Sequence, residues 1–160
     1  MGLFTRKTKK EKVIDKIYNS FYVKENIIEN FRINERDFDC IVISSYGLFI
    51  FRILTSKYEI KKNGDNFFTL NEKDEEVDLG NPFLELEKDK EIISKLINKE
   101  DLPFYLEVII GKNKNFKVNE EFGIGQFRQK LDKYHKCVEN YVVDDVFKFI
   151  KNVSCHIIIK

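Results

Sequence analysis

Histidine and cysteine side chains, which could hold zinc or act as a nucleophile, are few in this chain, and their spacing argues against most such sites. His135 lies two residues before Cys137, and Cys155 is followed directly by His156. Structural zinc sites use other loop spacings, so we expect surface histidines and a packing thiol here. Gly123–Gly125 lacks the rest of a phosphate-binding loop or a dinucleotide fingerprint, and it indicates the entry to a helix.

The elements that must position any site begin with a helix and three strands. Apolar residues at helical spacing predict the helix over residues 13–21. Three apolar runs then predict strands, over residues 22–28, 38–43 and 48–54. The connection at 44–47 is short, so the last two strands should form an antiparallel hairpin.

Turn and capping signals divide the middle of the chain. The turn signal Asn63-Gly64-Asp65 predicts a second hairpin between the runs 58–60 and 67–70. The acidic residues 71–80 are expected to form a solvent loop. Asn81-Pro82 predicts a helix start, because Asn accepts hydrogen bonds from free amides and Pro gives up no needed donor in the first turn.

A strand over 104–110 and two short helices complete the order, the first along 126–137 and the second from an Asp144 cap. Residues 155–160 are expected to add an edge strand or a tail. The fold class is therefore α/β, with a single mixed, largely antiparallel sheet flanked by helices and a short C-terminal helical appendix. We expect a basic arm over residues 1–10 and one domain over 11–160.

The predicted hairpin at 37–54 carries a specific pattern. It has an acidic–apolar–Asp start, an apolar strand, a turn that ends in Gly and a second apolar strand. Asn81-Pro82 and the helix start at Lys10-Glu11 agree with the same pattern, with Lys10 where Gly is usual. The pattern resembles the NERD (nuclease-related) domain of the PD-(D/E)xK restriction-endonuclease-like superfamily, over roughly residues 11–110. The resemblance implies an α-β-β-β-α-β core.

The resemblance also implies a nuclease site, and several of its positions are changed. Such enzymes cut a phosphodiester with Mg²⁺, held by an Asp on one strand and a Glu on the next, with a Lys two residues after the Glu. Asp39 stands at the Asp position, but Arg52 replaces the Glu and Leu54 the Lys. Arg has no lone pair to offer a metal and keeps its positive charge. Glu11 and Glu85 stand at the two helix positions, Glu85 where Gln is expected.

We therefore expect a pseudo-nuclease, without catalytic residues or a cofactor, that acts as a binding or regulatory module. Its partner would be a nucleic acid or a nucleic-acid-handling protein complex. Asp39 and Arg52 are expected to form an ion pair across the hairpin. If the hairpin register differs by one residue, Arg52 is instead an ordinary surface residue.

Two other functions stay open. One is a small phage- or plasmid-type inhibitor or interaction protein. The other is a divergent Mg²⁺-dependent nuclease with a migrated site, in which Asp39 binds the metal. The residues that could replace the lost Glu and Lys in such a site are Glu11, Glu29, Glu59, Glu85, Lys57 and Lys61.

The charge of the chain is balanced, with 28 Lys and Arg against 27 Asp and Glu and a net charge of +1. This balance argues against binding DNA or RNA mainly by bulk positive charge, but local basic patches are compatible with it. The alternative for these patches is an ordinary solvated surface. The candidate nucleic-acid contacts are Lys7, Lys9, Lys10, Arg128, Lys130, Lys133 and Lys136.

Composition and cysteine usage indicate a cytoplasmic protein with no membrane partner. No apolar run approaches the roughly 18 to 20 residues of a membrane span. The three cysteines are far apart in the sequence, which favours reduced thiols. Alanine is absent from the 160 residues, as expected for a very AT-rich genome. Nothing in the sequence indicates an oligomeric state.

Overall fold

The computed structural model describes residues 7–21, 26–98, 101–111 and 120–156. Its elements are α1 (Lys9–Tyr18), β1 (Ile27–Ile33), β2 (Arg36–Ser44), β3 (Gly47–Leu54), β4 (Ile60–Asn63), β5 (Asn66–Leu70), β6 (Glu76–Gly80), α2 (Pro82–Ile97), β7 (Phe104–Ile110), the 3-10 helix η2 (Glu120–Phe122), α3 (Ile124–Lys133), α4 (Asn140–Val153) and β8 (Cys155–His156).

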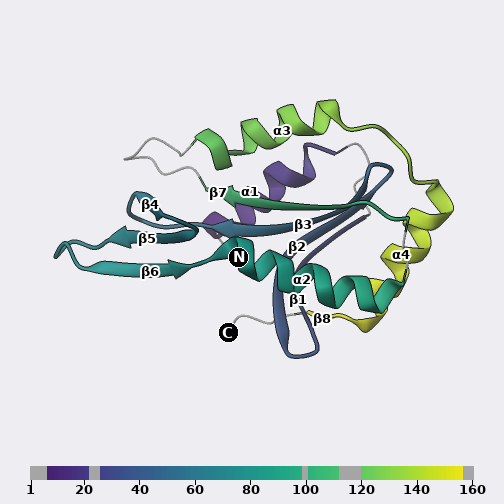
Figure 1. The fold of residues 1–160 in the computed structure, drawn as a ribbon, viewed down its shortest axis with the longest axis horizontal. Helices are drawn as coiled ribbons and strands as arrows, with labels where there is room; N and C mark the ends of the chain where they lie inside the picture. Colours follow the sequence, from purple (N-terminus) through teal and green to yellow (C-terminus); the bar gives the residue numbers. More distant parts are fainter. Residues whose placement is uncertain (1–6, 22–25, 99–100, 112–119, 157–160) are drawn as a thin grey trace, which may run out of the picture.

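A five-stranded mixed sheet forms the centre of the domain, in the order β7-β3-β2-β1-β8. Strands β1, β2 and β3 form an antiparallel meander, and β7 joins β3 in parallel. Helices α1 and α3 cover one face, and α2 and α4 cover the other (Figure 1). Because both faces are covered, β2 and β3 are apolar along most of their length. The predicted α/β class, the helices on the sheet and the C-terminal helices are confirmed.

Each face of the sheet has its own apolar core. Against α1 and α3 lies an aromatic cluster in which the ring centroids of Phe51 and Phe127 are 5.1 Å apart. Against α2 and α4 lie aliphatic residues such as Ile41 and Ile50, both fully buried. This division means that alternate residues of one strand contact different helices.

A second sheet of three antiparallel strands, β4-β5-β6, extends away from the body, and we call it the wing (Figure 1). The prediction of a single sheet is therefore wrong. The predicted hairpin is present, but the acidic loop at 71–80 contains β6, in which Val77 and Leu79 alternate with charged residues. Charged residues are common on edge strands, where they limit pairing with other chains. In this segment they made the sequence resemble a solvent loop rather than a strand.

Several predicted boundaries also need correction. The first strand is Ile27–Ile33 rather than 22–28, of which 22–25 lie outside the described residues. Helix α3 ends at Lys133, so His135 follows the helix, and α4 begins before Asp144 with Glu139 at its cap position. Helix α1 begins at Lys9, inside the predicted arm. These ends depend on chain packing, which local propensity does not record.

Other local signals are confirmed. Asn81 caps α2 by accepting a hydrogen bond from the Leu84 amide at 3.1 Å. Gly123 precedes α3 as its cap residue. Gly47 has a φ of 143°, and a Cβ there would lie 2.5 Å from the carbonyl oxygen of Pro103. The glycine of the hairpin signature is therefore required by the close approach of the chain that leads into β7.

The predicted edge strand at 155–160 is present as β8, which pairs with β1, while residues 157–160 lie outside the described part. No helix among the described residues is both long and apolar enough to cross a membrane.

Candidate functional site

Strands β2 and β3 stop pairing where Asp39 stands. Their ladder runs from the Ser44–Gly47 pair to the Cys40–Phe51 pair. Just beyond this end, the Ile53 amide of β3 donates a hydrogen bond to Oδ2 of Asp39 at 2.8 Å. On the other side of β2, the register with β1 passes from Glu29–Cys40 to Phe31–Phe38. Asp39 is therefore not paired with Asn30, whose φ is 45°. The Asp39 carboxylate therefore replaces a backbone acceptor at an irregular point of the sheet.

The second oxygen of Asp39 forms an ion pair with Lys10 of α1. The Asp39 side chain is 12% exposed and that of Lys10 34%. The predicted ion pair between Asp39 and Arg52 is wrong. Asp39 is bound by the helix on one face of the sheet, whereas Arg52 extends toward α2 on the other face.

Arg52 binds Asp89 of α2 with the planar fork of its guanidinium group. Nε donates to Oδ2 at 2.8 Å and Nη2 donates to Oδ1 at 2.7 Å. Nη2 also donates to the backbone carbonyl of Asp37 at 2.8 Å, beyond the end of the β2–β3 ladder. Asp89 is fully buried. A buried carboxylate needs this kind of paired, hydrogen-bonded environment, and bidentate contact with arginine supplies it.

Arg36 joins the same carboxylate from the β1–β2 hairpin. Its Nε donates to Oδ1 of Asp89 at 2.6 Å, and its Nη2 donates to Oε2 of Glu85 at 2.6 Å. The Lys88 ammonium group lies 3.8 Å from the other Glu85 oxygen. We call Arg36, Arg52, Glu85, Lys88 and Asp89 the arginine cluster. It joins the meander to the amino-terminal half of α2.

The electrostatics of the cluster favour the ionised forms of Glu85 and Arg36. Burial acts to raise the pKa of Glu85, but the hydrogen bond and positive charge of Arg36 outweigh it and lower that pKa. Burial likewise opposes the charge on Arg36, yet its contacts with Asp89 and Glu85 raise its pKa. The ion pair between Glu85 and Arg36 is therefore retained at neutral pH.

The remaining positions named by the family resemblance do not complete this cluster. Leu54 is partly buried and packs on the apolar core beside α2. Glu11 lies in the first turn of α1, where its amide is capped by the Thr8 hydroxyl at 3.1 Å. Of the lysines considered for a migrated site, Lys57 lies 3.5 Å from the carboxylate of Glu72.

Most of the predicted nucleic-acid contacts have partners inside the domain. Lys7 pairs with Asp15 and Lys10 with Asp39, while Lys9 donates to the Ser56 carbonyl. On α3, Arg128 donates to the Ser20 hydroxyl at 2.9 Å, and Lys130 lies 3.1 Å from the buried carboxylate of Glu107. Lys133 and Lys136 are exposed. Binding of nucleic acid by these residues stays a prediction.

Sequence reasoning missed Asp89, Arg36 and Glu107. A signal for Asp89 was present, because it lies three residues after Leu86 and four before Ile93, within the buried stripe of α2. Glu107 interrupts the apolar run of β7 in the same way. A charged residue at a core position needs a partner, so each of these two was a site candidate.

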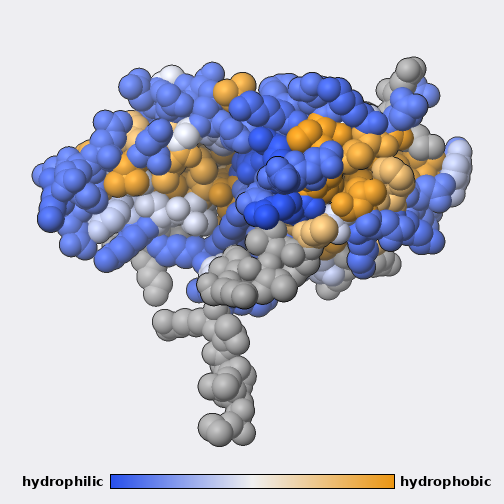
Figure 2. Space-filling view, turned by 90° about the horizontal axis from the view of Figure 1, so that it is seen from below, coloured by the Kyte–Doolittle hydropathy of each residue, from blue (hydrophilic) through white to orange (hydrophobic). Residues whose placement is uncertain are grey.

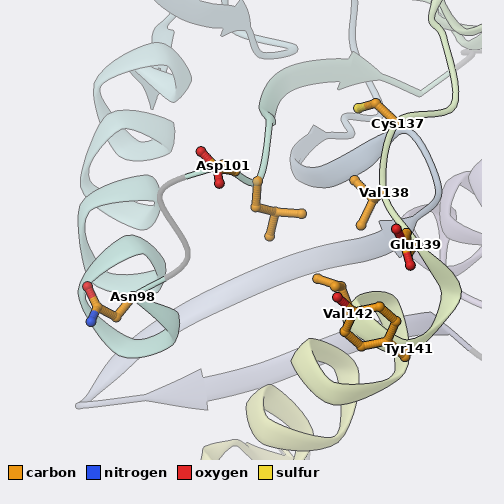
Figure 3. Close-up of a pocket in the computed structure, with 8 residues that line it drawn as sticks. Asn98, Asp101, Cys137, Val138, Glu139, Tyr141 and Val142 are labelled. Atoms are coloured by element: carbon orange, nitrogen blue, oxygen red, sulfur yellow. The ribbon is translucent and has the colours of Figure 1, made fainter.

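A cavity of about 570 Å³ lies between the end of α2, the residues before β7 and the start of α4 (Figure 3). Asn98 and Glu139 are among the residues around it. Asn98 is about 20 Å along the helix from Glu85, at a rise of 1.5 Å per residue, so this cavity is separate from the arginine cluster. Among the described residues, no group of three or more His, Cys, Asp or Glu side chains is placed to hold a metal ion.

The features that resemble the NERD domain are the hairpin at 37–54, the Asn81-Pro82 helix start and the helix start at Lys10-Glu11. The structure places them in β2 and β3, at the start of α2 and in α1. The chain matches the nuclease-related domain (NERD) family over residues 6–143, and it belongs to that family. The match is longer than the stretch 11–110 on which the resemblance was based. We found no match to the chain among curated proteins or solved structures.

Proposed function

We propose that this protein is a NERD-family domain without nuclease activity that binds a nucleic acid or a nucleic-acid-handling protein complex. The observation that carries the proposal is the internal pairing of the carboxylates around the opened hairpin. Asp39 is bound by Lys10, and Asp89 is bound by Arg36 and Arg52. A divalent cation that entered here would have to displace positively charged side chains that are already hydrogen-bonded.

The chemistry of the donors supports the same proposal. Mg²⁺ prefers several carboxylate or carbonyl oxygens that converge in near-octahedral geometry. Two residues of this chain that differ from the family pattern each add a positive charge. They are Lys10 in place of Gly and Arg52 in place of Glu. The residues present therefore do not fit the metal that the family implies.

The test combines a cleavage assay with metal titration. The purified protein is incubated with supercoiled plasmid, single-stranded DNA and RNA in Mg²⁺ and in Mn²⁺, beside an Asp39→Ala variant. Calorimetric titration of both metals accompanies the assay. We expect no cleavage above the Asp39→Ala background and no metal binding by the wild type. Metal-dependent cleavage that Asp39→Ala abolishes would refute the proposal and favour the migrated-site nuclease.

A matched variant shows whether internal cations block the metal. Lys10→Gly, Arg52→Glu and Leu54→Lys are combined, because the structure shows a basic side chain on each face of the opened hairpin. Circular dichroism first confirms that the triple variant folds. Mn²⁺ binding by the triple variant, with none by Lys9→Gly, would support the proposal. Within the described part of the chain, Lys9 donates its hydrogen bond to a backbone carbonyl rather than to a carboxylate.

A further inference from the structure

The arginine cluster has hydrogen-bonding capacity that its internal partners leave unused. Among the described residues, no hydrogen bond uses Nη1 of Arg36 or Arg52. Their side chains are 20% and 15% exposed, so both groups reach the surface. Each guanidinium group carries donors in a fixed plane, and a free Nη1 adds two more N–H groups at the edge of the cluster.

The charges of the cluster do not cancel. It contains three basic side chains against two carboxylates, and one of these carboxylates, Asp89, is fully buried. The other, Glu85, has a 41% exposed side chain and lies in the first turn of the 16-residue helix α2. The amino end of a helix favours negative charge, so an anion at the place of Glu85 is stabilised by the helix as well as by the arginines.

We propose that the arginine cluster is a metal-free site for a backbone phosphate of a nucleic acid, and that Glu85 occupies it in the unbound protein. On binding, the phosphate takes the Arg36 contact from Glu85 and gains Nη1 of Arg52 and the ammonium group of Lys88. This inference rests on the proposed function and names the ligand of its site.

Phosphate fits the free donors better than a carboxylate does. The Glu85 carboxylate is planar and contacts Arg36 through one oxygen. A phosphodiester offers two free oxygens at a tetrahedral angle, one toward each arginine, and it stays ionised throughout the physiological pH range. The face of the molecule seen in Figure 2 has a strongly hydrophilic band between two hydrophobic areas, one over the wing and one over α4.

The experiment measures the affinity of a short fluorescein-labelled single-stranded oligonucleotide by anisotropy, without divalent metal. Glu85→Gln removes the competing charge and should tighten binding about tenfold. Lys88→Gln should weaken binding and reduce the salt slope by about 0.7, the value for one phosphate contact on a single strand. Both side chains are substantially exposed, so neither variant endangers the fold. Glu87→Gln is the matched control, an equal charge change at an exposed position of α2.

The possible outcomes distinguish an error in the proposed phosphate site from an error in the proposed function. If the wild type binds the oligonucleotide but Glu85→Gln behaves like Glu87→Gln, the site is wrong and the binding function stands. If Glu85→Gln binds inorganic phosphate by NMR but no oligonucleotide, the ligand is a free phosphate and the proposal fails. Equal competition by polyglutamate would reassign the site to an acidic protein and also overturn it. Cleavage of the oligonucleotide on a gel after Mg²⁺ or Mn²⁺ is added would instead refute the non-catalytic function.

Discussion

Replacing Asp89 with Asn tests whether the arginine cluster holds α2 on the central sheet. The substitution keeps the shape of the side chain but removes its charge. In the native protein, the buried carboxylate accepts three hydrogen bonds, one from Arg36 and two from Arg52. An Asn side chain has one acceptor oxygen, and its amide group would point N–H donors at guanidinium donors.

The expected loss of stability follows from this geometry. Removing one partner of a buried ion pair costs about 3–5 kcal/mol, because the groups left behind stay buried without compensation. In a domain of this size, each kcal/mol lowers Tm by about 2–4 °C, so the Asp89→Asn variant should melt roughly 10 °C lower. Both arginines are partly exposed, which allows water to compensate some of the loss and favours the lower half of the range.

The assays are urea unfolding and thermal melting, both followed by circular dichroism, with Asp37→Asn as the control. Asp37 also pairs with an arginine of the same hairpin, Arg32, but its side chain is 56% exposed. An exposed pair contributes about 1 kcal/mol or less, so the control should change little. If Asp89→Asn loses no more stability than Asp37→Asn, the cluster is not the structural link between the hairpin and α2 that we describe.

Three further predictions concern other parts of the domain. Lys130→Met should destabilise by about 1–3 kcal/mol in urea unfolding, because it leaves the buried carboxylate of Glu107 without this partner, and Lys133→Met on the same helix should not. Since the pKa of Glu85 is lowered in the folded state, its contribution is present above its unfolded pKa of about 4.3 and is lost as pH falls through the folded pKa. The Glu85→Gln variant should therefore lose less stability than wild type between pH 6 and 3, by no more than about 1 kcal/mol because the side chain is well exposed. Cys40 is fully buried and its pKa is raised by burial, so a thiol reagent should modify it only on unfolding, while the other two cysteines react in the native protein.

Much of the fold could be predicted because its signals are local. The hairpin of β2 and β3 appears as two apolar runs about a short turn, and Asn81-Pro82 marks the start of α2 within one residue. The wing was harder, because β6 alternates apolar with charged residues and has only one neighbour in its sheet. The end of α3 was also missed, because the apolar residues after Lys133 continue the helical spacing of 3.6 in the sequence. The helix nevertheless ends at Lys133.

The candidate site was predicted less well than the fold. The positions of Asp39, Arg52 and Glu85 came from the family pattern, but their partners did not. The register of the β2–β3 ladder, continued by one residue, would place Asp39 opposite Arg52 on the same face of the sheet. The two strands no longer pair at this point, and Asp39 contacts α1 whereas Arg52 contacts α2. Ion pairs that join residues distant in sequence, such as Arg36 with Asp89, depend on how α2 packs, which no local pattern records.

The opening of the β2–β3 ladder has a consequence for how sequences in this family should be compared. At this point two backbone groups, the Ile53 amide and the Asp37 carbonyl, are satisfied by the side chains of Asp39 and Arg52. Substituting Asp39 with a residue that has no acceptor would leave the buried Ile53 amide unpaired, whatever the protein binds. Selection for stability alone can therefore preserve Asp39, so its presence in a related sequence is not by itself a mark of retained nuclease chemistry.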